Sequence, residues 1–81
     1  MGWEIVQEEF TNPPFSSTPQ SAVCSPGKRV LSGGYTMPNG ISASASRPAG
    51  TNGWEVVPPG NYGFALDFTV YAICAFADLN V

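Results

Sequence analysis

The stretch 64–76, FALDFTVYAICAF, decides the fold of this 81-residue chain. Alternate residues of a β-strand lie on opposite faces, so the stretch divides into two sets. The first set is wholly apolar and consists of Phe64, Leu66, Phe68, Val70, Ala72, Cys74 and Phe76. The second set, from Ala65 to Ala75, becomes apolar toward its end. Such a strand is typical of the middle of a sandwich, or of a strand whose outer face meets another subunit. Both interpretations are open here.

Shorter strand-like segments precede this stretch. We expect strands over residues 2–10, 21–24, 28–36, 41–46 and 53–57. Ser25-Pro26-Gly27 predicts a hairpin turn between two of them. Gly33-Gly34 predicts a bulge or a close backbone approach. No segment has a sustained 3.6-residue period, so residues 1–81 predict one all-β domain, a small antiparallel β-sandwich or barrel of about six strands.

Charged side chains are scarce. Three basic and six acidic residues give a net charge of −3, which argues against nucleic acid as a partner because nucleic-acid binding needs a basic patch. No stretch approaches the roughly 20 apolar residues of a membrane helix, so no membrane partner is expected either. The N-terminus lacks a signal-peptide pattern. This predicts either a start at a domain boundary or release from the cell by another route, such as lysis.

The two cysteines, Cys24 and Cys74, lie fifty positions apart. This spacing matches no zinc or redox motif, and the chain has no histidine to complete a metal site. We expect a disulfide, with two free buried thiols or one reactive thiol as the alternatives. A disulfide persists in oxidising compartments. We therefore expect an extracellular, cell-surface or virion location.

The sequence predicts no catalytic residue, no metal site and no cofactor. Histidine, the commonest general base, is absent. Glu8 and Glu9 are neighbours on a predicted strand and therefore face opposite sides, whereas glycosidases need two carboxylates in one cleft. Glu55 and Asp67 converge only if the tertiary fold happens to bring them together. We therefore expect a protein that is not an enzyme.

Aromatic residues are the candidates for ligand contact, because aromatic rings stack on sugar faces. Tyr62 and Asn61, in the glycine-flanked loop 60–63, are the first candidates, followed by Trp54 and Tyr35. The alternative role for all of them is packing or an interface. Gly2-Trp3-Glu4-Ile5-Val6 recurs as Gly53-Trp54-Glu55-Val56-Val57, which predicts two strands that each anchor a tryptophan in one core.

Four motifs resemble a known module. The segment 22–35, AVCSPGKRVLSGGY, resembles a V-x-C-P-x-G-K-x-V-L-G-G-G signature. The segments 2–6, 53–56 and 69–75 resemble its companions G-Y-E-I-V, G-W-x-V and V-x-V-Y-A-I-C-A, in the same order. The module is a small bacterial and bacteriophage domain often found C-terminal to collagen-like repeats in fibre or surface proteins. Ser25, where the signature has proline, and Ser32, where it has glycine, depart from the pattern.

The resemblance implies a trimeric cap, because collagen-like stalks are trimeric. We therefore expect a non-enzymatic assembly module at the tip of a phage or bacterial surface fibre, with itself as the partner. Its interface is predicted over residues 41–46 and 64–81, with contacts from Phe64, Phe68, Tyr71, Phe76, Leu79 and Val81. The alternative hypothesis is a carbohydrate- or receptor-binding module whose partner is a cell-surface glycan.

Overall fold

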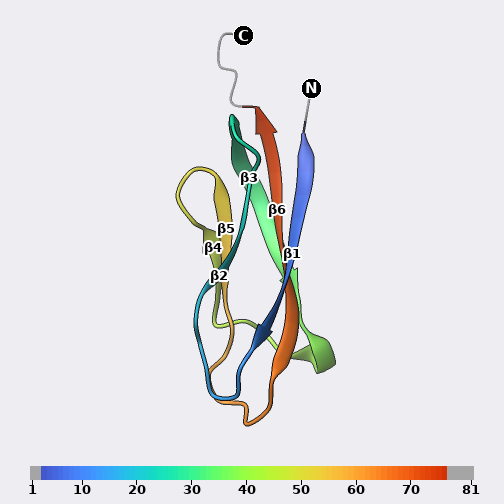
Figure 1. The fold of residues 1–81 in the computed structure, drawn as a ribbon, viewed down its shortest axis with the longest axis vertical. Coiled ribbons are helices and arrows are strands. Elements are labelled where there is room, and N and C mark those ends of the chain that lie inside the picture. The colour runs from blue at the N-terminus through green and yellow to red at the C-terminus, as the bar shows by residue number, and fades with distance from the viewer. Residues whose placement is uncertain (1–2, 77–81) are drawn as a thin grey trace.

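The computed structural model describes residues 3–76, which form two three-stranded antiparallel sheets packed face to face (Figure 1). The first sheet has the order β1-β6-β3, with β1 at Glu4–Asn12, β6 at Leu66–Phe76 and β3 at Lys28–Thr36. The second has the order β2-β5-β4, with β2 at Gln20–Val23, β5 at Gly53–Val57 and β4 at Ala45–Pro48. A single 3-10 turn, η1 (Pro38–Gly40), follows β3. The predicted all-β sandwich of six strands is confirmed.

β6 is the central strand of the first sheet. It pairs with β1 over nine residues, from Glu4 opposite Cys74 to Asn12 opposite Leu66, and with β3 on its other side. Its inward-facing residues alternate without a break and are all buried: Leu66, Phe68, Val70, Ala72 and Cys74. The expectation that Phe68 belongs to an interface is wrong. This side chain is 3% exposed and packs on Phe10 within the domain's own core, with 5.7 Å between ring centroids.

The predicted hairpin at Ser25-Pro26-Gly27 is a crossover between sheets. β2, which precedes it, pairs with β5, whereas β3, which follows it, pairs with β6. The disulfide between Cys24 and Cys74 is confirmed. Cys24 follows β2 and Cys74 lies in β6, so the bond joins the two sheets.

Two further segments differ from their prediction. The strand expected over 41–46 begins only at Ala45, because Ile41 closes the η1 turn by donating its backbone N–H to the Pro38 carbonyl. The bulge of β3 lies between Val30 and Ser32 rather than at the glycine pair. The other prediction for the glycine pair, a close approach to the backbone, holds at Gly33, because the Trp54 ring lies directly over its Cα.

The two tryptophans of the repeated motif have different environments. Trp54 shares the inward face of β5 with Val56, packs against the core, and donates its Nε1–H to Ser46 Oγ at 2.8 Å. Trp3 is 66% exposed, so the expectation that it anchors the core is wrong. In β1 the core side carries Val6 and Phe10 instead. The same five-letter pattern therefore lies in opposite phase in the two strands, which puts Trp3 and Ile5 outward.

Candidate functional site

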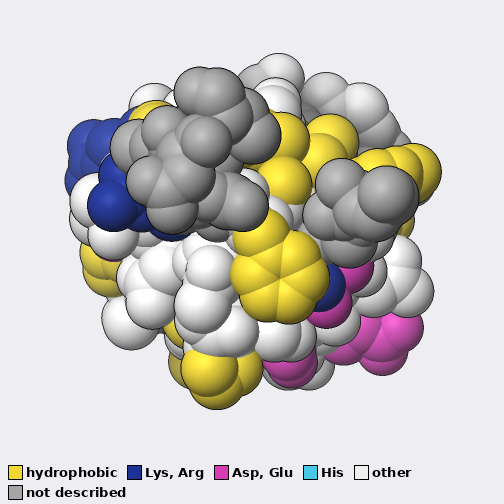
Figure 2. All heavy atoms as spheres, turned by 90° about the horizontal axis from the view of Figure 1, so that it is seen from above, with side chains coloured by type: hydrophobic (Ala, Val, Ile, Leu, Met, Phe, Trp, Pro, Cys, Tyr) yellow, Lys and Arg dark blue, Asp and Glu magenta, His cyan; other side chains and the backbone are white. Residues whose placement is uncertain are grey.

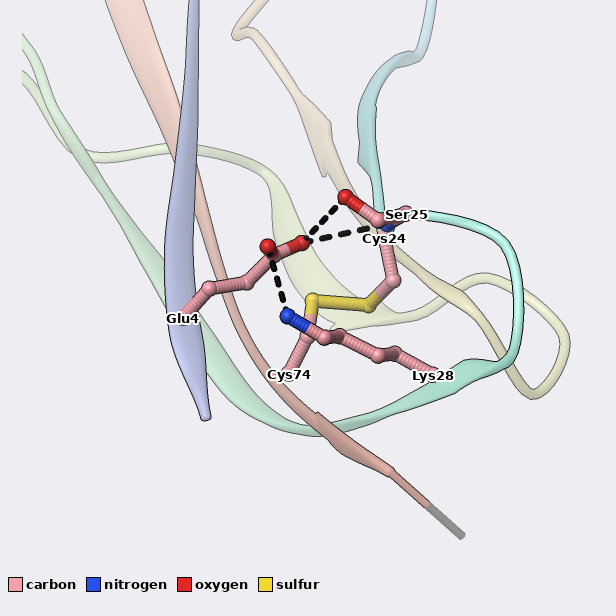
Figure 3. Close-up of a disulfide and its surroundings, with 5 residues drawn as sticks. All are labelled: Glu4, Cys24, Ser25, Lys28 and Cys74. Atoms are coloured by element: carbon pink, nitrogen blue, oxygen red, sulfur yellow. Dashed lines mark hydrogen bonds and ion pairs between the residues drawn. A yellow bond between two sulfur atoms is a disulfide. The ribbon is translucent and has the colours of Figure 1, made fainter. Parts of the chain in front are cut away.

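A polar cluster covers the disulfide at the end of the sandwich where β1 begins and β6 ends (Figure 3). Lys28 Nζ lies 2.8 Å from one carboxylate oxygen of Glu4. The other oxygen of Glu4 accepts hydrogen bonds from the Ser25 hydroxyl at 2.7 Å and from the Ser25 backbone N–H at 3.1 Å. The ammonium of Lys28, followed by the two Ser25 donors, lowers the pKa of Glu4 from 4.5 to about 2. The cluster ties the start of β1 to the crossover that carries Cys24.

The contribution of the Glu4 carboxylate to stability is predicted to depend on pH. Because folding lowers the pKa of Glu4, its stabilising contribution is complete above pH 4.5 and is lost as the pH falls toward about 2. Glu4→Gln is therefore expected to lower the melting temperature at neutral pH, by an amount that shrinks through this acid window. Thermal unfolding of both proteins across the pH range measures the difference. A gap of constant size down to pH 2 would show that the ionised carboxylate contributes nothing.

Large exposed hydrophobic side chains gather at this same end. Of the seven such side chains among residues 3–76, five lie here: Trp3, Ile5, Val23, Leu31 and Phe76. They come from the start of β1, the end of β2, the first half of β3 and the end of β6. We call this set the apolar end. In the view onto this end, hydrophobic side chains show at several places around the face, most of the basic atoms lie on one side, and the acidic atoms lie on the other with a few basic atoms beside them (Figure 2).

Phe64, Tyr71 and Phe76 were predicted as interface residues, and the structure gives each a different setting. Phe76 belongs to the apolar end, with Lys28 Nζ 5.0 Å from its ring centroid. Tyr71 is half-buried on the outward face of β6. Phe64 is exposed at the opposite end of the sandwich. The predicted contacts Leu79 and Val81 lie outside the described residues.

The predicted ligand contacts do not form one site. Tyr62 is half-buried and packs on Phe64 with 5.3 Å between ring centroids, while Asn61 beside it is exposed. Trp54 and Tyr35 lie between the sheets, and the Tyr35 hydroxyl accepts a hydrogen bond from the backbone N–H of Ala43. Packing is therefore the observed role of Trp54 and Tyr35. Tyr62 and Asn61 remain at the surface, at the end of the sandwich away from the apolar end.

A hollow of about 630 Å³ lies where β1 ends, β6 begins and β3 runs into η1. Register places five of its lining residues on the outward face of the sheet, since Glu9 lies opposite Thr69, Thr11 opposite Asp67, and Thr36 opposite Thr69 on the other side. The remaining lining residues are Phe10, Met37, Pro38 and Phe68. Glu9 and Asp67 thus bring two carboxylates into one hollow.

Sequence reasoning missed this hollow. The sequence predicted only that Glu8 and Glu9 face opposite sides of their strand, and its expectation of Trp3 in the core put Glu9 on the wrong face. The alternation of β6 separates Asp67 and Thr69 from its wholly apolar face. The missing information was the pairing of the first strand with the last. No local sequence signal specifies that the start of β6 lies beside the end of β1.

Within residues 3–76 no group of three or more histidine, cysteine or acidic side chains is placed to hold a metal ion. The same residues contain no helix of the length and hydrophobicity needed to cross a membrane. Comparisons with protein-family models, curated proteins and solved structures found no match to this chain. The function therefore has to be inferred from the geometry of the domain itself.

Proposed function

We propose that this domain is a non-enzymatic assembly module, and that three copies form the cap or tip of a phage or bacterial surface fibre outside the reducing cytosol. The observation that carries the proposal is the apolar end. Single exposed hydrophobic residues are normal on a protein surface, whereas several together mark an interaction site. Here they surround the end of the sandwich, with Ile5 on the outer face of the first sheet and Val23 on the outer face of the second. Five of the seven in the described residues share one end, and the other two, Phe15 and Phe64, lie at the opposite end.

The distribution of charge supports association between copies of the same chain. β1 and β3 are the two edges of the first sheet. β1 carries three acidic residues and no basic one, while β3 carries Lys28 and Arg29 and no acidic one. Glu4 and Lys28 already form an ion pair within the chain and Glu9 lines the hollow, so Glu8 on the edge of one copy and Arg29 on the edge of the next are the complementary charges. A head-to-tail contact of this kind generates a closed ring when the rotation between copies closes.

The remaining parts of the proposal have separate support. The number three follows from the resemblance to modules that end trimeric collagen-like stalks. The extracellular location is compatible with the disulfide, because such bonds persist in oxidising compartments. The absence of histidine from the whole sequence supports a non-enzymatic role. A stalk joined ahead of β1 would meet the domain at the apolar end, which would leave the opposite end free.

The proposal predicts the effect of one substitution on mass in solution. Wild-type protein is expected to sediment at three times the chain mass of 8.5 kDa. Trp3→Asp is expected to sediment as a monomer, because it places a charge within the apolar end. Phe15→Asp is the matched control, since Phe15 is 71% exposed at the other end and should leave the trimer intact. A monomeric wild type, or equal masses for the two variants, would contradict the proposal.

A further inference from the structure

We propose that the hollow between β1, β6 and η1 is a binding site for a neutral saccharide. This proposal goes beyond the assembly role and concerns the other half of the sandwich. Its volume of about 630 Å³ falls within the range of small-ligand sites, roughly 300–1,000 Å³. The observation that carries it is the combination of hydroxyl, carboxylate and apolar groups around one hollow.

The polar groups of the hollow suit a ligand rich in hydroxyls. Glu9 and Asp67 provide carboxylate oxygens, which accept hydrogen bonds from sugar hydroxyls. The Thr69 hydroxyl can donate and accept, while the hydroxyls of Thr11 and Thr36, which donate to Asp67 and Tyr71, can accept. Asp67 is held in place, because Thr11 Oγ1 donates to its Oδ1 at 2.7 Å. A carboxylate fixed in this way offers its remaining lone pairs in a defined direction.

The charge of the hollow decides between classes of saccharide. No lysine or arginine lines it, and both ionisable groups are acidic. A sialylated or uronate-containing saccharide would bring a third carboxylate into this field without a cation to offset it. A neutral saccharide introduces no charge and presents only hydroxyls and C–H groups. Met37 and Pro38 give the hollow apolar surface for the C–H groups, whereas the rings of Phe10 and Phe68 face the core.

The next outward-facing residue of β6 after Thr69 is Tyr71, which carries an aromatic ring. Tyr71 stands between Gln7 and Gly34 in register, and its hydroxyl accepts a hydrogen bond of 3.2 Å from Thr36 Oγ1. Gly34 is the β3 residue opposite Tyr71, and a Cβ built on it would meet no atom within 4 Å, so the space beside Tyr71 on the β3 side is open. The sheet therefore continues the hollow toward a half-buried aromatic ring. A saccharide of more than one unit would extend from the hollow along the outward face of the first sheet, toward Tyr71.

A metal ion is the main rival occupant, and the donor set disfavours it. Calcium is bound by six to eight oxygen ligands, usually including several carboxylates. The hollow offers two carboxylates, and Asp67 already accepts a bond from Thr11. Binding of calcium is therefore an outcome that the experiment must detect separately.

The test is a glycan array with neutral oligosaccharides and their sialylated counterparts, followed by calorimetry with the strongest neutral binder. We expect binding to neutral glycans that persists in the presence of EDTA. Glu9→Gln and Asp67→Asn should each weaken it at least about tenfold, the effect of removing a charged hydrogen-bond acceptor. Glu55→Gln is the matched control, because it makes the same chemical change on β5 in the other sheet, and should bind as the wild type does.

Three outcomes would overturn the proposal: no neutral glycan bound, equal binding by Glu9→Gln and wild type, or binding that requires calcium. Circular dichroism of each variant separates lost binding from lost folding. The assembly proposal fails or holds independently, because Trp3→Asp alters the opposite end of the sandwich. That variant is expected to bind the glycan with the affinity per chain of the wild type, even as a monomer.

Discussion

Replacement of both Cys24 and Cys74 by alanine is expected to lower the free energy of unfolding by about 4 kcal/mol, the chain-entropy value for a loop of fifty residues. A domain of this size is stable by roughly 4–12 kcal/mol in total, so the bond would account for about a third or more of the free energy of unfolding. The structure adds a reason for a large effect. The bond joins β6, the centre of one sheet, to the end of β2 in the other. Without it, the sheets are held together at this end by side-chain packing, the crossover, the hydrogen bonds of Glu4 to Ser25, and the hydrogen bond from the Val30 N–H to the Thr51 carbonyl.

Urea denaturation of the variant and of the wild type measures this difference. Wild type reduced with a phosphine should show a similar loss, which separates the lost bond from the substituted side chains. A loss below about 1 kcal/mol in both experiments would show that the packing and hydrogen bonds between the sheets hold them together without the disulfide.

Gly33→Ala is expected to cost about 3 kcal/mol, at the upper end of the range for overpacking a core. Its new Cβ would overlap the Trp54 ring and the backbone carbonyl oxygen of Tyr71. The carbonyl belongs to the central strand and cannot rotate away, and the Trp54 ring is held by its hydrogen bond to Ser46. Relief would require β3 to move away from β6.

Gly34→Ala is the control for this prediction. The two glycines are adjacent in β3, but a Cβ on Gly34 meets nothing within 4 Å. Its effect is therefore expected to stay within about 0.5 kcal/mol. Chemical denaturation of the two variants side by side gives the comparison. Equal losses would mean that the contact of Gly33 with Trp54 does not explain the requirement for glycine.

The sequence predicted the elements that depend on alternation alone. Residues 64–76 indicated a strand with one wholly apolar face and a second face that becomes apolar toward its end, and β6 is the centre of its sheet. The pairing of Cys24 with Cys74 was also predictable, since no other cysteine exists and no metal motif competes. The first inference uses only the local alternation of side chains, and the second has only one possible cysteine pair.

The errors have a common cause, which is that pairing and phase are tertiary properties. Pro26 and Gly27 indicated a turn correctly, but a turn motif does not specify whether its flanking strands pair with each other. The repeated tryptophan motif gave no phase, because which face of a strand is buried depends on the sheet that covers it. Trp3 and Trp54 consequently have opposite environments. The hollow was beyond prediction for the same reason, because β1 and β6 meet only in the folded chain.

The two proposals assign separate roles to the two ends of one sandwich. The apolar end holds the disulfide, the Glu4 cluster and the exposed hydrophobic side chains, and in our account it joins copies of the chain. The hollow lies where β1 ends and η1 begins, away from that contact. A fibre tip needs both properties, since one end must hold the assembly together and the other must face what the fibre meets.

The central claim, that copies associate through the apolar end, is tested most directly by the fluorescence of Trp3. In a Trp54→Phe variant, Trp3 is the sole tryptophan and reports the environment of this end. As the protein concentration rises, we predict a shift of its emission to shorter wavelength and a fall in acrylamide quenching, because the exposed ring becomes buried against a neighbouring copy. Emission that stays red-shifted and fully quenchable at every concentration would contradict the claim.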